Sequence, residues 1–131
     1  MKILIATAGP VPAKKKAEYI VSIAKRLDAE LIALHILRGE QTKAKGEEAI
    51  EIFTQAGQEA HVNVVKVLEK GDIVPTIVKT AEKEGADLIV MGASDGKVVT
   101  EWISASVTEK TKMPVVVIPS HEFKKAATIS S

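Results

Sequence analysis

Short apolar runs recur along the chain at intervals that predict the strands of a β-sheet. Each run is rich in Val, Ile, Leu and Ala, and turn residues or polar segments separate it from the next. Most runs are apolar almost throughout, as expected of strands covered on both faces, whereas the third alternates in part, like a strand nearer an edge. The expected strands are Lys2–Thr7, Glu30–Leu37, His61–Leu68, Leu88–Met91 and Val115–Ile118.

Between these runs, apolar residues recur at helical spacing and predict amphipathic α-helices. Pro12 suits the first position of one helix, Asp72 is a good N-cap residue for another, and Gly85 is a typical stop. The regular alternation of strand and helix predicts an α/β fold, a parallel sheet with right-handed crossovers and helices on both faces. The expected helices are Ala13–Leu27, Glu47–Ala60, the segment between Asp72 and Gly85, and Val99–Thr111.

Composition narrows the class of protein. The chain has 131 residues, of which 46% are hydrophobic and only 3% aromatic, which fits one domain with an aliphatic core. It has no cysteine, so disulfides and thiolate chemistry are excluded. The net charge of +1 does not favour a nucleic-acid binder, and the run Lys14–Lys16 is interpreted as a solvated helix face. We see no apolar run of membrane-spanning length and no secretory signal, so we expect a cytoplasmic protein without membrane or nucleic-acid partners.

The candidate chemistry lies in two loops that follow strands. In parallel sheets of this kind, ligands bind beyond the carboxyl ends of the strands, where the strand order reverses. One loop is Ala8–Pro12, and the other is Gly92–Val98, which contains Ser94, Gly96 and Lys97 and leads into a helix. A glycine-bearing loop before a helix start is suited to holding an anion, but the alternative is that these glycines only make the turn.

No enzymatic site stands out in the sequence. We find no nucleophile with a nearby base, no paired carboxylates and no cluster of metal ligands. Phosphoryl transfer would need a metal ligand and a well-placed cation, and Asp95 with Lys97 is too little for that. The sequence therefore predicts neither catalytic residues nor a metal site.

The runs GADLIVMGAS, SVTEK and PVVVI carry a resemblance to a known family. They stand in order within a stretch from Met1 to about Pro119 that resembles the universal stress protein family, leaving residues 120–131 as a C-terminal tail. The resemblance implies a Rossmann-like sheet in the order 3-2-1-4-5, of the adenine nucleotide alpha hydrolase-like type. It also implies a role in stress response or regulation.

The same resemblance indicates whether this chain should bind ATP. Family members that bind ATP are similar in carrying Gly-x-x-Gly, nine residues, then Gly-Ser or Gly-Thr, and here the three glycine positions hold Gly92, Asp95 and Ala105. Asp95 places a carboxylate where phosphate oxygens would lie, and at about 4 Å two like charges repel by roughly 1 kcal/mol even in bulk water. We therefore expect a family member that does not bind ATP tightly. The alternative is an ATP- or AMP-binding switch, using Mg²⁺ with ATP, in which Gly96 and Lys97 restore the loop.

The resemblance also implies which residues would contact a nucleotide. Ile36 matches an adenine-pocket position, with ordinary core packing as its alternative, while Ala8 replaces the aspartate usual after the first strand. His35 is interpreted as a hydrogen-bonded structural residue rather than a metal ligand. The implied site comprises Ala6, Thr7, Ala8, Ile36, Met91, Gly92, Ser94, Asp95, Gly96, Lys97, Ser106, Val107 and Thr108.

The last expected strand, Val115–Ile118, raises the question of quaternary structure. A bare apolar edge strand invites pairing with another chain. The resemblance implies a homodimer made through this strand. The alternative is that the tail, Ser120–Ser131, folds back over the edge.

Overall fold

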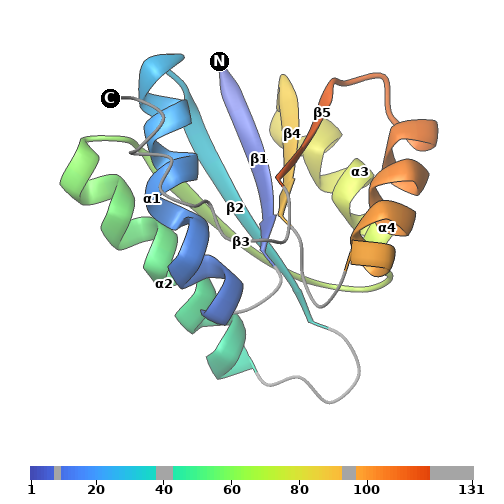
Figure 1. Cartoon of the computed structure of the whole chain (residues 1–131), viewed down its shortest axis with the longest axis horizontal. Helices are drawn as coiled ribbons and strands as arrows, with labels where there is room; N and C mark the ends of the chain where they lie inside the picture. Colours follow the sequence, from blue (N-terminus) through green and yellow to red (C-terminus); the bar gives the residue numbers. More distant parts are fainter. Residues whose placement is uncertain (8–9, 38–42, 93–96, 119–131) are drawn as a thin grey trace.

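Five parallel strands form one sheet in the order β3-β2-β1-β4-β5 (Figure 1). The computed structural model describes residues 1–7, 10–37, 43–92 and 97–118. Both the strand order and the α/β class agree with the sequence-based expectation. In chain order the elements are β1 (Lys2–Thr7), α1 (Pro10–Arg26), β2 (Glu30–Leu37), α2 (Lys43–Ala60), β3 (Val64–Lys70), α3 (Ile73–Glu84), β4 (Leu88–Gly92), α4 (Lys97–Lys110) and β5 (Val115–Ile118).

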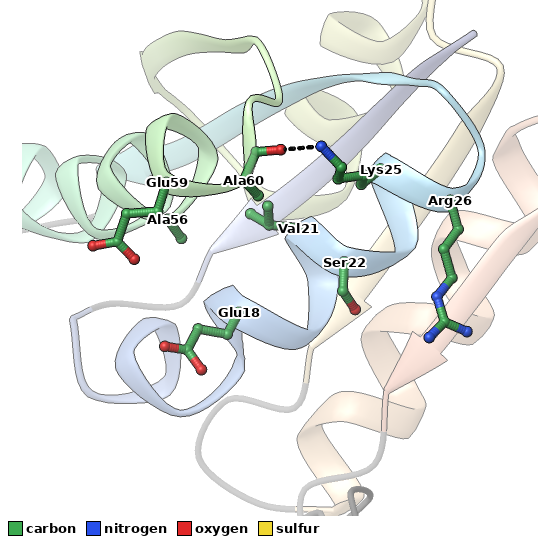
Figure 2. A pocket seen from close by; sticks show the side chains of 8 residues that line it. All are labelled: Glu18, Val21, Ser22, Lys25, Arg26, Ala56, Glu59 and Ala60. Carbon is green, nitrogen blue, oxygen red and sulfur yellow. Dashed lines mark hydrogen bonds between the residues drawn. The ribbon is translucent and has the colours of Figure 1, made fainter. Parts of the chain in front are cut away.

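The helices cover the sheet from both sides. Helices α1 and α2 pack side by side over β1, β2 and β3, and the Nζ of Lys25 on α1 donates a hydrogen bond to the carbonyl of Ala60 on α2, 2.6 Å away (Figure 2). Helices α3 and α4 pack against each other on the opposite side (Figure 1). The chain therefore forms three layers, helix, sheet and helix.

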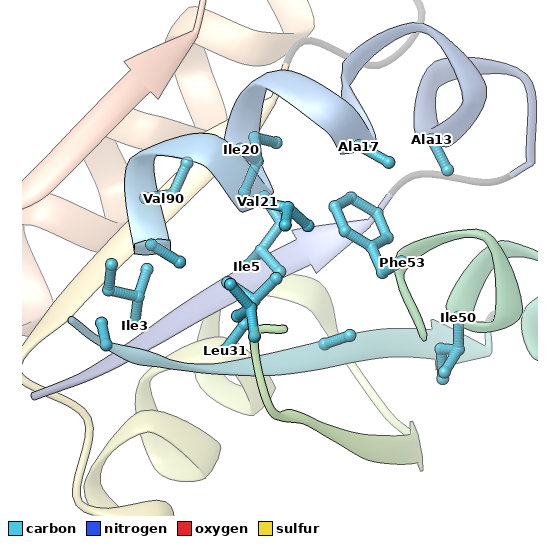
Figure 3. Packing of buried hydrophobic residues seen from close by; sticks show 14 of the residues in the cluster. Ile3, Ile5, Ala13, Ala17, Ile20, Val21, Leu31, Ile50, Phe53 and Val90 are labelled. Atoms are coloured by element: carbon cyan, nitrogen blue, oxygen red, sulfur yellow. The ribbon is translucent and has the colours of Figure 1, made fainter. Parts of the chain in front are cut away.

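Successive residues of the central strand serve two separate cores. On β1, Ile3 and Ile5 point to the α1–α2 side, where they pack with Phe53 of α2 (Figure 3). Leu4 points to the α3–α4 side and packs with Ile77 of α3. Because side chains alternate across a strand, a strand covered on both faces must be apolar at every position. This explains the uninterrupted apolar runs in the sequence.

Three helices begin earlier than the pattern of apolar residues predicts. Helix α1 begins at Pro10. A proline is tolerated in the first turn of a helix, because the N–H that it lacks would have no helical partner there. Helix α2 begins at Lys43, whose ammonium lies 3.8 Å from the carboxylate of Glu47 one turn later, an exposed pair that adds roughly 0.3 kcal/mol. Helix α4 begins at Lys97, two residues before the expected start.

The third strand lies further along the chain than expected. His61 adopts a positive φ of 61° at the end of α2, so it belongs to the helix end and not to the strand. The amide N–H of Val62 then donates to the carbonyl of Gly57, which closes that turn at 2.8 Å. The strand therefore begins at Val64 and extends to Lys70.

The ends of α3 agree in position with the sequence analysis, but one cap differs in detail. Gly85 ends the helix in the left-handed region at φ 70°, and its N–H donates to the carbonyl of Glu82. Asp72 takes the N-cap position with an extended backbone, yet its carboxylate accepts no capping hydrogen bond. The backbone of Asp72 still contributes, since its carbonyl accepts from the N–H of Thr76 at 3.1 Å.

Candidate functional site

The strand order reverses between β1 and β4, and this point lies at the carboxyl ends of the two strands. From β1 the chain moves outward through β2 to β3, then crosses the sheet to β4 and continues outward to β5. Strands β1 and β4 end at Thr7 and Gly92. Ligands of doubly wound sheets bind at such a reversal, so this is the candidate site.

Three of the expected site residues form an apolar surface at this edge of the sheet. Ala6 on β1 pairs in register with Met91 on β4, and Ile36 lies on β2 one residue beyond the partner of Thr7. All three side chains are on the α3–α4 side, where Ile36 is 8% and Met91 5% exposed and Ala6 is half-buried. We call Ala6, Ile36 and Met91 the apolar floor, since they lie on one face of three adjacent strands near their carboxyl ends.

Helix α4 completes the edge with its N-terminus. It begins at Lys97, five residues after β4 ends at Gly92, so its first backbone N–H groups lie on the carboxyl side of the sheet. Free N–H groups and the helix dipole make such a position favourable for a negative charge. Four expected site residues, Ala8, Ser94, Asp95 and Gly96, lie outside the described residues.

Three further expected site residues, Ser106, Val107 and Thr108, lie in the last two turns of α4. Helix α4 runs back toward the amino edge of the sheet, and Ser106 is roughly 13 Å along its axis from Lys97. Val107 is wholly buried in the core on the α3–α4 side, and the hydroxyl of Thr108 donates to the carbonyl of Ser104 at 2.8 Å. Val107 therefore shares the core on the α3–α4 side with Ile36 and Met91. Ser106 and Thr108 lie beside it on α4, which is one unbroken helix through Ala105.

His35 is a buried residue with one ring nitrogen that is unpartnered within the described ranges. Its side chain is only 3% exposed and lies beneath α2, where a Cβ added at Gly46 would come within 2.7 Å of the ring's Cδ2. Its Nδ1 is buried and has no hydrogen-bond partner among the described residues. Within this part of the chain, the hydrogen bond expected of His35 is therefore not made by Nδ1. Position in an apolar strand predicted the burial of His35 but not the lack of a partner.

A shallow groove of about 450 Å³ between α1 and α2 was not predicted from the sequence. Its apolar base includes Val21 and Ala56, while carboxylates of Glu18 and Glu59 and the ammonium of Lys25 stand at its sides (Figure 2). The groove lies toward the C-terminal ends of both helices, near the amino edge of the sheet and away from the apolar floor. Helical spacing marks Glu18, Lys25 and Glu59 as solvent-facing, and only the pairing of two helices makes them the sides of a groove.

The described residues contain neither a metal-binding cluster nor a membrane-spanning helix. Within residues 1–7, 10–37, 43–92 and 97–118, no group of three His, Asp or Glu side chains is placed to hold a metal ion. Over the same ranges, no helix has both the length and the apolar composition needed to cross a membrane.

Comparisons with known proteins agree with this architecture. The family model of the universal stress proteins matches residues 1–119. A universal stress protein of Methanocaldococcus jannaschii is 31% identical over 137 aligned residues, which cover 89% of this chain and 81% of the relative.

Solved structures of the same family share the fold. A universal stress protein in complex with cAMP has a TM-score of 0.75 at 17% identity, over 92% of this chain and 98% of its own. An Arabidopsis thaliana protein with AMP bound has a TM-score of 0.73 at 19% identity, over 100% and 99% of the two chains. An Archaeoglobus fulgidus protein in complex with dAMP has a TM-score of 0.69 at 20% identity, over 91% and 98%.

Proposed function

Because the chain belongs to the universal stress protein family, we propose that it is a cytoplasmic regulatory protein of the stress response that acts by binding rather than by catalysis. The sequence offers no nucleophile–base pair and no paired carboxylates for an enzymatic step. Regulation would then depend on whether a ligand occupies the site at the β1–β4 reversal and on which other protein chains contact its surfaces.

The ligand that we propose for this site is an adenine nucleotide with a single phosphate, bound far more tightly than ATP. The apolar floor of Ala6, Ile36 and Met91 carries this proposal, since it places apolar side chains, which suit a purine, at the point where α/β sheets bind ligands. The N-terminus of α4 would take one phosphate. Relatives with bound AMP, dAMP and cAMP support this choice of ligand class.

Two features argue against tight ATP binding. Asp95 adds a negative charge to the loop that would hold a polyphosphate, at a cost of roughly 1 kcal/mol or more per close phosphate oxygen. Ala105 lies inside an unbroken α4, so the N–H groups of Ser106 and Val107 are used within the helix and do not face a ligand. ATP with Mg²⁺ is the second candidate, favoured by Gly96 and Lys97 in the same loop.

Calorimetric titration with AMP and with ATP plus Mg²⁺ tests the proposal, with the fluorescence of Trp102, the only tryptophan, as a second reporter. We expect AMP to bind with a dissociation constant at least tenfold below that of ATP. The variant Ala6→Leu should lose AMP binding, because the added side chain occupies the apolar floor. Ala56→Leu is the matched control, since Ala56 is also half-buried but lines the distant α1–α2 groove.

Two outcomes would overturn this assignment. One is the absence of any heat or fluorescence change up to millimolar AMP, and the other is equal AMP affinity of Ala6→Leu and the unchanged protein. Tighter binding of ATP than of AMP would instead establish the second candidate.

We also propose that the protein is a homodimer paired through β5. Strand β5 pairs only with β4, so its other edge is open within the described residues. Val116 and Val117 are each 43% exposed on this short, wholly apolar strand. An open apolar edge of this kind favours pairing with another chain.

A further inference from the structure

Part of the sheet on the α1–α2 side is left exposed at β5. Helices α1 and α2 contact β1, β2 and β3 (Figure 1), and the core beneath them also buries Val90 of β4 and Ile118 of β5, at 2% and 3% exposure. Val90 of β4 and Val116 of β5 are partners in register on this face, and Val116 is 43% exposed. Leu88, two residues before Val90, is half-buried on the same face.

The adjacent flank of α1 is also apolar. Tyr19, Ile23 and Leu27, the last just after the end of α1, follow at intervals of four residues and form one row. Two residues of the groove lining, Ser22 and Arg26, lie directly beside this row. Tyr19 is 39% and Leu27 45% exposed. We call Tyr19, Ile23, Leu27, Leu88 and Val116 the β5 shelf. It joins much of the exposed large apolar surface of the described chain into one region.

We propose that the β5 shelf is covered by the chain's own C-terminal segment, residues 119–131, with Phe123 as its apolar anchor. The family match ends at residue 119, so residues 120–131 of this chain lie beyond what the family model includes. They follow β5 directly, and Ile118, the last residue of that strand, is buried on the side of the sheet that carries the shelf. Residues 119–131 themselves lie outside the described part of the structure.

The length of the segment fits this role. The five residues from Ile118 to Phe123 span up to about 17 Å when extended, and the row from Tyr19 to Leu27 is roughly 12 Å long. Glu122 precedes Phe123, and Lys124 and Lys125 follow it, while the exposed Arg26 and Asp28 stand at the end of the row, so both sides carry charges of both signs. The segment would then lie over the face of β4 and β5, which leaves the open edge of β5 free to pair with a second chain.

The absence of cysteine from the sequence permits a direct test in the full-length chain. A cysteine introduced by Leu27→Cys should react with a thiol reagent at least fivefold more slowly than in the double variant Leu27→Cys/Phe123→Ser. A cysteine introduced by Glu82→Cys is the control, because Glu82 is exposed on α3 at the other side of the sheet. Its reaction rate should not change with Phe123→Ser. Equal rates for Leu27→Cys with and without Phe123 would overturn the proposal.

A disulfide experiment identifies the segment directly. Under mild oxidation, Leu27→Cys/Phe123→Cys should form a disulfide within one chain, which requires Cα atoms within about 7 Å. The pair Glu82→Cys/Phe123→Cys should not form one. Disulfide-linked dimers, or a protection of the thiol in Leu27→Cys that rises with protein concentration, would show that a second copy covers the shelf and would overturn the proposal.

Discussion

At the scale of single residues, two glycines fix how closely α2 approaches the sheet. A Cβ at Gly57 would lie 2.5 Å from Cγ2 of Val64 and 2.8 Å from the backbone oxygen of Val62. A Cβ at Gly46 would meet only side chains, at 2.7 Å from His35 and 2.9 Å from Leu68. Side chains can shift more cheaply than backbone, so the two positions should differ in their tolerance of a methyl group.

We therefore predict that Gly57→Ala destabilises the protein more than Gly46→Ala does. Overpacking costs about 1–3 kcal/mol, and the better helix propensity of alanine returns about 1 kcal/mol in both variants. We expect a net loss of roughly 2 kcal/mol for Gly57→Ala and of roughly 1 kcal/mol for Gly46→Ala. Urea unfolding measures both, with Glu48→Ala at an exposed position of α2 as the control. A larger loss for Gly46→Ala would contradict the distances.

Gly85 supports a second prediction at this scale. Its φ of 70° lies in the left-handed region, and an added Cβ would meet no other atom within 4 Å. The cost of Gly85→Ala is thus a backbone cost alone, about 1 kcal/mol, and Gly85→Asn should cost less because asparagine tolerates this conformation. Thermal unfolding of both variants tests the order. Equal stability of the alanine variant and the unchanged protein would rule out the left-handed cap.

At the scale of elements, the pattern of apolar residues predicted the positions of most strands. It did not predict the start of α2 or the position of β3. Apolar runs located four of the five strands to within a residue, since burial on both faces leaves a plain signal. The start of α2 was missed because its first turn, at Lys43, carries polar residues that leave no apolar stripe. The third strand was misplaced because Val62 is buried like a strand residue although it belongs to the turn after α2.

In the candidate site, too, some positions could be predicted from the sequence and others could not. The positions of Ala6, Ile36 and Met91 follow from strand order and alternation, and both could be predicted. The place of Ser106 deep inside α4 could not, because it depends on whether the helix continues through Ala105. Sequence spacing marks Ser106 as a site residue, whereas the length of the helix decides how far it lies from the helix start at Lys97.

The helix α4 leads to a prediction about ATP. In Asp95→Gly/Ala105→Gly, the loop loses a negative charge, and glycine at 105 favours an opening of α4 that would free the N–H groups of Ser106 and Val107. We expect ATP affinity to rise at least tenfold. We also expect a loss of roughly 1 kcal/mol in stability, because glycine replaces alanine inside a helix.

Calorimetry with ATP and Mg²⁺ and urea unfolding measure the two effects of this double variant. The single variants serve as controls, since Asp95→Gly should change affinity without the full cost in stability. Unchanged ATP affinity in the double variant would show that these two positions are not the obstacle.

At the scale of the whole molecule, the sheet has two edges, β3 and β5, that are open within the described residues and differ in character. Strand β3 carries Lys66, Glu69 and Lys70, which discourage pairing with another chain. Strand β5 carries no charge at all along Val115–Ile118. The difference in charge, rather than the topology, favours β5 as the surface that another chain pairs with.

A lysine substitution on each edge strand therefore tests whether β5 or β3 forms the dimer interface. Val117→Lys places a charge on β5, on the α3–α4 side and hence away from the β5 shelf, and should convert the proposed dimer to a monomer. Val65→Lys places the same charge on β3, on the same side of the sheet, and should leave the dimer intact. Sedimentation velocity gives the mass of each variant, and circular dichroism confirms that each is folded. A dimer that persists in Val117→Lys, or dissociates only in Val65→Lys, would exclude β5 as the seam, because a charge weakens pairing only at the edge that pairs.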